Sequence, residues 1–163
     1  MRATLDKFLS KYNNPNLYFM HADMWSFPLF KNKFPERCIN VGIQEPNMIN
    51  VAGGLASQGK KVIVYGVAGF VIHRAYEQIK FSVLNFGNNV TFVNAGANGC
   101  YSAAGKGHIL NDDALIMRAL GIELFEPEDR SSFLQCVIGS IRYPGTCYIR
   151  LGWDNCEWKI NES

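Results

Sequence analysis

Short β-branched runs alternate with helix-like segments along this chain, and this alternation constrains its fold more than any other feature. The strand-like runs span about 17–22, 38–42, 61–67, 90–95, 122–125 and 146–151. Segments with helical spacing of apolar residues span about 3–12, 45–57, 71–85, 112–120 and 129–142. Strands separated by helices of this length predict a mostly parallel sheet covered on both faces, which is a three-layer α/β/α sandwich.

The length and charge of the chain limit the number of domains and the classes of partner that it can be expected to have. At 163 residues the chain is expected to be a single domain, residues 1–163, with a polar C-terminal tail over about 152–163. A formal net charge of +2, with Lys and Arg scattered, gives no reason to expect a nucleic acid or a membrane as partner. No apolar run approaches the roughly 20 residues of a membrane span, and no signal peptide is expected, since the first ten residues hold charges and no apolar core segment.

The chain has five cysteines, an odd number without the spacing of metal ligands. This pattern favours reduced thiols in a cytoplasmic protein over disulfides or zinc, and no metal site is expected. Cys100 is the only one of the five in a stretch with functional character. It is interpreted as an inert small residue, because thiolate activation requires a positive neighbour.

Glu45 is the most informative single residue. It follows the strand-like run 39–43 and opens a helix rich in small residues, so it is placed at the carboxyl end of a parallel strand, where open α/β sheets bind ligands. Its neighbours Val41, Ile43 and Met48 cannot ionise. Two interpretations follow: a carboxylate that the helix dipole stabilises by about 0.3–1 kcal/mol, or an acid that shares a proton with a heterocyclic nitrogen.

Two connections, 24–37 and 96–111, are too long to be simple turns. The first carries aromatic residues and two prolines, and the second is rich in Gly and Ala. Loops of this length inside a compact domain usually bind something. Because both follow strands, both are expected near the edge of the sheet that holds Glu45.

The segment 34–59 carries Gly-Ile-Gln-Glu, ending at Glu45, followed by Ala-Gly-Gly-Leu-Ala. It resembles the pyrimidine-binding domain of transketolase-like enzymes. Further motifs that are similar to that family are Ala-Asp at 22–23, Arg-Ala-Tyr-Glu-Gln-Ile at 74–79, and the stretches 112–120 and 126–129. Together they extend the resemblance over most of residues 17–150.

The resemblance implies a cofactor and a set of site residues. In that family, thiamine diphosphate lies between domains of two subunits, and the acid at the position of Glu45 hydrogen-bonds the aminopyrimidine and favours proton removal from the thiazolium C2. Glu45 is therefore expected to be both catalytic and cofactor-binding. The resemblance further implies that Phe70 stacks on the pyrimidine, that Ile43 contacts the cofactor, and that Asp23 positions the thiazolium end. The alternative for Asp23 is a loop cap.

The loop that follows departs from the family pattern. An acidic Gly-Glu-Asp-Gly loop, which touches sugar hydroxyls in transketolases, is replaced by Tyr-Ser-Ala-Ala-Gly-Lys-Gly-His at 101–108. His108 keeps the place of a substrate-contacting histidine and is a candidate catalytic residue, although a lone loop histidine is also common on surfaces. Lys106 indicates either an anionic substrate or a solvated charge. Val67 replaces a second aromatic of the family, so the clamp on the ring is expected to be one-sided.

Three other polar residues allow two interpretations each. Arg74 and His73 either face a phosphate or lie on the helix surface, where Arg74 has Glu77 and Gln78 at pairing distance. His21 follows an apolar strand and is expected in the core rather than as a ligand.

The sequence contains no Gly-Asp-Gly with a later Asn, which is the diphosphate and magnesium signature of the family. The resemblance therefore implies a split enzyme in which a separate diphosphate-binding transketolase subunit holds Mg²⁺. This chain is expected to form a homodimer within a heterotetramer. Gly53 and Gly54 allow close packing either against such a partner or within the domain.

The function expected from this resemblance is transfer of a ketol unit between sugars, with a sugar phosphate or a sugar nucleotide as substrate. One alternative is a subunit of a thiamine diphosphate-dependent 2-oxoacid decarboxylase or dehydrogenase, and another is a non-catalytic scaffold with the same fold. A dinucleotide-binding fold is disfavoured, because no Gly-x-Gly-x-x-Gly opens a helix after the first strand.

Overall fold

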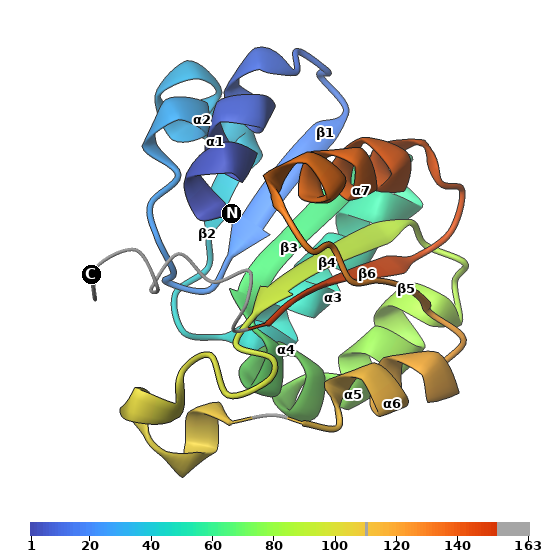
Figure 1. Ribbon diagram of the computed structural model, residues 1–163. Helices are drawn as coiled ribbons and strands as arrows, with labels where there is room; N and C mark the ends of the chain where they lie inside the picture. Colours follow the sequence, from blue (N-terminus) through green and yellow to red (C-terminus); the bar gives the residue numbers. More distant parts are fainter. Residues whose placement is uncertain (110, 153–163) are drawn as a thin grey trace, which may run out of the picture.

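The computed structural model describes residues 1–109 and 111–152, and it is built around one six-stranded sheet (Figure 1). The strand order is β2-β1-β3-β4-β6-β5, and every pairing among these strands is parallel. The strands are β1 (Leu17–His21), β2 (Cys38–Asn40), β3 (Lys61–Val67), β4 (Val90–Ala95), β5 (Glu123–Phe125) and β6 (Cys147–Leu151).

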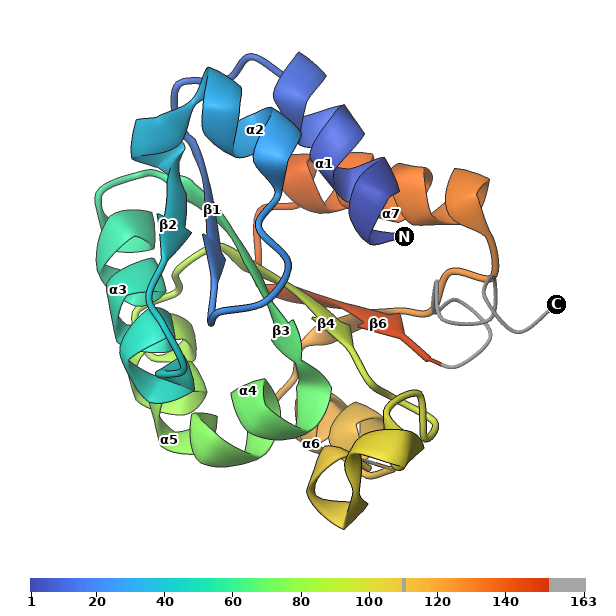
Figure 2. The same cartoon turned by 90° about the vertical axis from the view of Figure 1, so that its left-hand side faces the viewer.

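Helices cover both faces of the sheet, so the predicted three-layer α/β/α sandwich is confirmed (Figures 1 and 2). The helices on one face are α1 (Arg2–Lys11), α2 (Pro28–Lys33) and α7 (Arg130–Arg142). The elements on the other face are α3 (Glu45–Ser57), α4 (Ala68–Arg74), α5 (Tyr76–Gln78), the π-helix η2 (Ile79–Leu84) and α6 (Asp113–Ala119). Side chains of the central strand β3 are buried along its whole length, as expected for a parallel strand covered on both sides.

The helix predicted over 71–85 starts earlier and is interrupted. It begins at Ala68, breaks at Ala75, where φ is −112° and ψ is 21°, and continues as α5 and the π-helix η2. Its predicted buried face is nevertheless correct, since Ala75, Ile79 and Val83 are all buried. Near its end the side-chain amide of Asn88 donates to the carbonyl oxygen of Ser82 at 2.9 Å, a contact that local periodicity does not reveal.

The connection over 24–37 was expected to be a long loop, but most of it has regular structure. It folds into α2 and a short 3₁₀ turn, η1 (Pro35–Arg37), and its aromatic side chains enter the core. Phe27 and Phe30 are fully buried, and the Phe27 ring centroid lies 4.2 Å from that of Phe19. The apolar character of this segment therefore reflects core packing between α1, α2 and the sheet.

The cysteines follow the expectation only in part. Cys38, Cys136 and Cys147 are free thiols, and burial raises the pKa of the Cys38 thiol to about 11. Cys100 is disulfide-bonded, so the prediction that all five cysteines are reduced is wrong at this position. The expected tail over 152–163 lies, except for Gly152, outside the described residues. None of the helices in the described part of the chain combines the length and apolarity needed to cross a membrane.

Candidate functional site

The site is built around the start of α3, at the carboxyl edge of the sheet. Strand β2 ends at Asn40, and Gly42, with φ of +74°, turns the chain toward the helix. α3 starts at Glu45, with Pro46 in its first turn, where the fixed φ of proline is favourable. The N-cap residue Gln44 makes no side-chain cap, and Glu45 supplies the negative charge of the first turn. Glu45 is only 4% exposed.

The partner of Glu45 is Arg74, at the end of α4. Its Nη1 atom lies 3.4 Å from Oε1 and 3.3 Å from Oε2 of the carboxylate. The Arg74 guanidinium also lies over the ring of Phe70, with Cζ 3.9 Å from the ring centroid. The sequence allowed Arg74 either to face a phosphate or to pair with Glu77 or Gln78 on its own helix, whereas in the structure it reaches from α4 to Glu45 at the start of α3.

Phe70 connects this pair to the loop that follows β4. The ring of His108, in the short 3₁₀ turn η4 (Lys106–His108), meets the Phe70 ring edge-on, with centroids 4.8 Å apart. Glu45, Arg74, Phe70 and His108 thus form one continuous set of contacts, which we call the Glu45 cluster. Three of the four residues were candidate site residues, and the structure brings them together from α3, α4 and η4.

Two other candidate residues border the cluster without contacting its charged groups. Ile43 lies two residues before Glu45 and is 70% exposed, so its side chain is available to a partner or ligand. Asp23 has φ of +49° and is held by Asn40: its backbone N–H donates to Asn40 Oδ1 at 3.0 Å, and its carboxylate accepts from Asn40 Nδ2 at 3.2 Å. Asp23 therefore fastens the end of β1 to the end of β2, which agrees with the loop-cap interpretation.

The remaining histidines and Lys106 have different surroundings. His73 pairs with Asp112 at 3.1 Å, and both side chains are about half exposed. Lys106 is exposed, as the solvated-charge interpretation expects. His21 is buried against the rings of Phe19 and Phe27, which confirms the expected core position. Burial lowers the pKa of His21, although the nearby charge of Asp23 acts in the opposite direction.

A buried ionic network near the end of β6 was not expected from the sequence. Arg150 Nε donates to the fully buried carboxylate of Asp113 at 2.6 Å, and Tyr148 donates to the same carboxylate at 2.7 Å. Arg150 also donates to Glu126 at 2.9 Å and to the side-chain oxygen of Asn98 at 2.8 Å. The network joins β6 and α6 to the base of the loop that carries His108. A cation in an otherwise apolar strand was the signal that could have revealed it.

The chemistry of the Glu45 cluster suits a flat, electron-poor heterocycle with N–H donors. The buried carboxylate offers two acceptor oxygens, and the Phe70 ring offers a stacking face. The guanidinium of Arg74, itself planar and cationic, occupies the space between them. In this structure the space is thus filled by a planar cation that stacks on Phe70 and donates to Glu45 at the same time. Among residues 1–109 and 111–152, no three His, Cys, Asp or Glu side chains are grouped to hold a metal ion.

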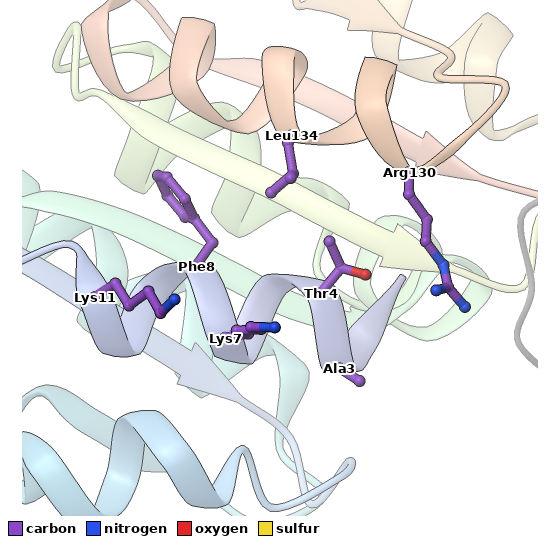
Figure 3. A pocket seen from close by; sticks show the side chains of 7 residues that line it. All are labelled: Ala3, Thr4, Lys7, Phe8, Lys11, Arg130 and Leu134. Carbon is purple, nitrogen blue, oxygen red and sulfur yellow. The ribbon is translucent and has the colours of Figure 1, made fainter.

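A separate hollow of about 560 Å³ lies on the opposite face of the sheet, between α1 and α7 (Figure 3). Its walls combine apolar and cationic side chains: Ala3, Thr4, Lys7, Phe8, Lys11, Arg130 and Leu134. None of these residues belongs to the Glu45 cluster or was a candidate from the sequence. The candidate site is therefore a surface edge beside α3 and α4 and does not coincide with this hollow.

Comparison with known families gives a match over residues 10–157 to the transketolase pyrimidine-binding domain. An apulose-4-phosphate transketolase subunit of Actinobacillus succinogenes is 36% identical over 123 residues, which cover 75% of this chain and 40% of that protein. A 6-deoxy-6-sulfo-D-fructose transketolase subunit of Clostridium sp. (strain MSTE9) is 33% identical over 123 residues, covering 75% and 38%. This chain thus spans about 40% of the length of these relatives.

Comparison with solved structures agrees. A split-gene transketolase, described as an inactive beta4 tetramer, superposes with a TM-score of 0.80 at 31% identity, covering 93% of this chain and 50% of that one. A transketolase from Campylobacter jejuni superposes equally well, with a TM-score of 0.80 over 93% of this chain and 25% of its own length, but at 15% identity. The second match supports the fold alone.

Proposed function

Because this chain belongs to the family of transketolase pyrimidine-binding domains, we propose that it forms the pyrimidine-binding part of a split, thiamine diphosphate-dependent transketolase-like enzyme. In this proposal it transfers a ketol unit between sugars together with a separate diphosphate-binding subunit. That subunit holds the diphosphate and Mg²⁺, and this chain forms a homodimer within a heterotetramer. The enzyme acts in the cytoplasm.

The observation that carries the proposal is the buried carboxylate of Glu45, which Arg74 links to the ring of Phe70 at the carboxyl edge of the sheet. A carboxylate that is 4% exposed is costly unless it is paired, and in this structure its partner is Arg74, whose side chain is 48% exposed. A cationic or N–H-donating heterocycle would pair with the same carboxylate and stack on the same ring. Arg74 contacts both the carboxylate of Glu45 and the ring of Phe70. A planar group stacked on Phe70 in its place could therefore reach the same carboxylate.

Each residue of the cluster has a distinct role in this proposal. Glu45 accepts a hydrogen bond from the pyrimidine nitrogen and in this way favours proton removal from the thiazolium C2. Phe70 stacks on one face of the ring, and Ile43 covers it from the exposed side of the β2–α3 turn. Bound there, thiamine diphosphate supplies a thiazolium ring that acts as an electron sink for carbon–carbon bond cleavage.

His108 and Asp23 act beside the ring rather than on it. His108 is placed by its edge-on contact with Phe70 so that its imidazole can contact substrate, as hydrogen-bond donor or as proton carrier. Asp23, held by Asn40, positions the neighbouring turn and with it the thiazolium end of the site.

The substrate in this proposal is a sugar phosphate or a sugar nucleotide. The loop over 101–108 contains no acidic residue and carries the exposed Lys106. A positive or neutral rim favours an anionic substrate, whereas the family loop with two acids favours contacts to sugar hydroxyls.

Reconstitution with the cognate diphosphate-binding chain tests the proposal. Ketol transfer between sugars should require both chains and added thiamine diphosphate with Mg²⁺. Glu45→Gln, which keeps the shape of the side chain and removes its charge, should abolish turnover while the complex still assembles on size-exclusion chromatography. Glu123→Gln, at an exposed position at the start of β5, is the matched control and should turn over normally.

The outcomes separate the alternatives. Release of CO₂ from a 2-oxoacid without ketol transfer would assign the chain to the decarboxylase or dehydrogenase class. A complex that assembles but never binds thiamine diphosphate would indicate a scaffold. Unchanged turnover in Glu45→Gln would remove Glu45 from the mechanism.

A further inference from the structure

Arg74 makes, from within the chain, the two contacts that the proposed function assigns to the pyrimidine ring. It donates to both oxygens of Glu45 from Nη1, and it lies over the Phe70 ring with Cζ 3.9 Å from the centroid. A guanidinium is planar, delocalised and cationic, and it stacks on aromatic rings while donating N–H groups in its plane. An aminopyrimidine that donates to a carboxylate has the same geometry.

In the proposed function the ring of the cofactor lies over Phe70 with its donor edge toward Glu45, which is the place that the Arg74 guanidinium holds in this structure. We propose that Arg74 is an internal occupant of the pyrimidine site, which pairs with Glu45 in the free chain and swings out when the ring of the cofactor enters. This inference rests on the proposed function. It makes Arg74 a residue that sets cofactor affinity, although it does not act on the substrate.

The exposure of the two side chains determines which of them moves. The Arg74 side chain is 48% exposed and has a flexible stem, whereas the Glu45 side chain is 5% exposed and fixed at the start of α3. A buried carboxylate left without a partner is strongly unfavourable, so Arg74 serves as its partner until a ligand replaces it. Because the Arg74 side chain is about half exposed, solvent can hydrate its guanidinium after the cofactor displaces it.

The lengths of the contacts favour displacement. Charge-assisted hydrogen bonds usually measure about 2.7–2.9 Å, whereas Arg74 lies 3.3 and 3.4 Å from the carboxylate oxygens. A heterocyclic N–H that reaches Glu45 at ordinary length is therefore a better partner than Arg74. The pair is close enough to satisfy Glu45 and loose enough to be exchanged.

The first test uses the isolated chain and needs no cofactor. Unfolding midpoints are measured for the wild type, Arg74→Ala, Glu45→Gln and the double variant, which together form a double-mutant cycle. Arg74→Ala should lower the midpoint by several degrees in the wild-type background and have little effect when Glu45 is already Gln. Additive effects would show that the two side chains are not coupled in solution and would overturn the proposal.

The second test measures thiamine diphosphate binding to the two-chain complex by isothermal titration calorimetry. Arg74→Ala should tighten binding by about tenfold, because the internal competitor is gone. Lys80→Ala is the control, since Lys80 Nζ lies 5.9 Å from the centroid of the Phe81 ring, in a cation–aromatic pair that includes neither Glu45 nor Phe70, and it should leave the affinity unchanged.

The results distinguish this inference from the proposed function. If the wild type binds and Arg74→Ala binds equally or more weakly, Arg74 is a bystander or a direct ligand, and the displacement is wrong while the function stands. If no variant binds thiamine diphosphate in the assembled complex, the proposed function fails and displacement by this cofactor fails with it. The coupling measured in the isolated chain then still reports whether Arg74 is the partner of Glu45.

Discussion

At the scale of single residues, the function proposed for this chain depends on the four side chains of the Glu45 cluster. One carboxylate, one guanidinium, one phenyl ring and one imidazole make up the Glu45 cluster. The phenyl ring has the simplest role, because Phe70 offers a face and no charge. Its effect on binding can therefore be estimated from stacking alone.

Phe70→Ala removes this face. Aromatic stacking contributes about 0.5–1.5 kcal/mol beyond burial of area, which corresponds to roughly a 2- to 12-fold loss of affinity for thiamine diphosphate. Titration of the two-chain complex measures it. Phe70→Tyr should retain affinity, and Phe81→Ala, which removes a half-exposed ring from η2, is the control and should have no effect. Equal affinity in Phe70→Ala would exclude stacking on this ring.

His21 gives a pH-dependent prediction. Its pKa is lowered chiefly by burial, so below the unfolded-state value of about 6.5 the unfolded chain takes up a proton that the folded chain does not. The free energy of unfolding should therefore fall as the pH falls from about 6.5 toward the lowered pKa, by at most about 1.4 kcal/mol per pH unit from this residue. Above pH 7 His21 should contribute no slope.

Urea unfolding at pH 7.0 and at pH 5.5 checks this for the wild type and His21→Leu. The variant should lose less stability than the wild type between the two pH values, because its buried side chain does not titrate. Parallel losses in the two proteins would show that protonation of His21 is not linked to unfolding.

At the scale of helices and strands, the close approach of α3 to η2 organises the face of the domain that carries the site. A Cβ atom added at Gly53 would overlap the backbone carbonyl of Ser82, whereas one added at Gly54 would meet nothing within 4 Å. Gly53 and Gly54 were expected to pack either against a partner or within the domain. In the structure, Gly53 packs within the domain, against η2. Gly54 is exposed on the outer side of α3.

These two neighbouring glycines form a matched pair for mutation. Gly53→Ala should destabilise the protein by about 1–3 kcal/mol, because backbone atoms of η2 have to move. Gly54→Ala should stabilise it by roughly 0.5–1 kcal/mol, because alanine is the better helix former and the site is open. Chemical denaturation of both variants measures the difference, and similar effects of the two changes would contradict the packing described here.

Much of the fold could be predicted at this scale because the signals are local. The limits of α3 and β3 follow from Pro46, from small residues and from an unbroken apolar run, all visible in sequence. The break at Ala75 and the π-helix could not be predicted, because the apolar spacing of Ala75, Ile79 and Val83 continues through both.

The candidate site, like the fold, could be predicted only where its sequence signals are local. Glu45, Phe70 and His108 could be proposed because their motifs are local and ordered along the chain. The pairing of Arg74 with Glu45 could not, since the two residues are 29 positions apart and a partner on the same helix was equally compatible with the spacing. The Arg150 network escaped prediction for the same reason, because Asp113, Glu126 and Asn98 come from three separate segments.

At the scale of the whole molecule, the Glu45 cluster lies at an edge where apolar side chains remain uncovered. Ile43 is 70% exposed, two residues before Glu45, and in the proposed function this position contacts the diphosphate-binding chain. Phe86 is 75% exposed, but it precedes β4 and so lies at the amino end of the sheet, away from the cluster.

Ile43→Glu should therefore weaken association with the diphosphate-binding chain by tenfold or more, because it places a charge in the expected contact. Phe86→Glu is the matched control and should associate normally. Analytical ultracentrifugation of the mixed chains measures both, and circular dichroism verifies that each variant is folded. Normal association of Ile43→Glu would show that the contact with the diphosphate-binding chain does not include Ile43.

The strand order also determines when this chain can finish folding. β6 is the last described strand in sequence, yet it lies between β4 and β5, and the only strand that β5 pairs with in the sheet is β6. A chain emerging from the ribosome can thus assemble β2, β1, β3 and β4, while β4 keeps an unpaired edge until Cys147–Leu151 arrives. Open strand edges invite pairing with other chains. The edge of β4 therefore stays open to such pairing in a newly made molecule until this last described strand is added.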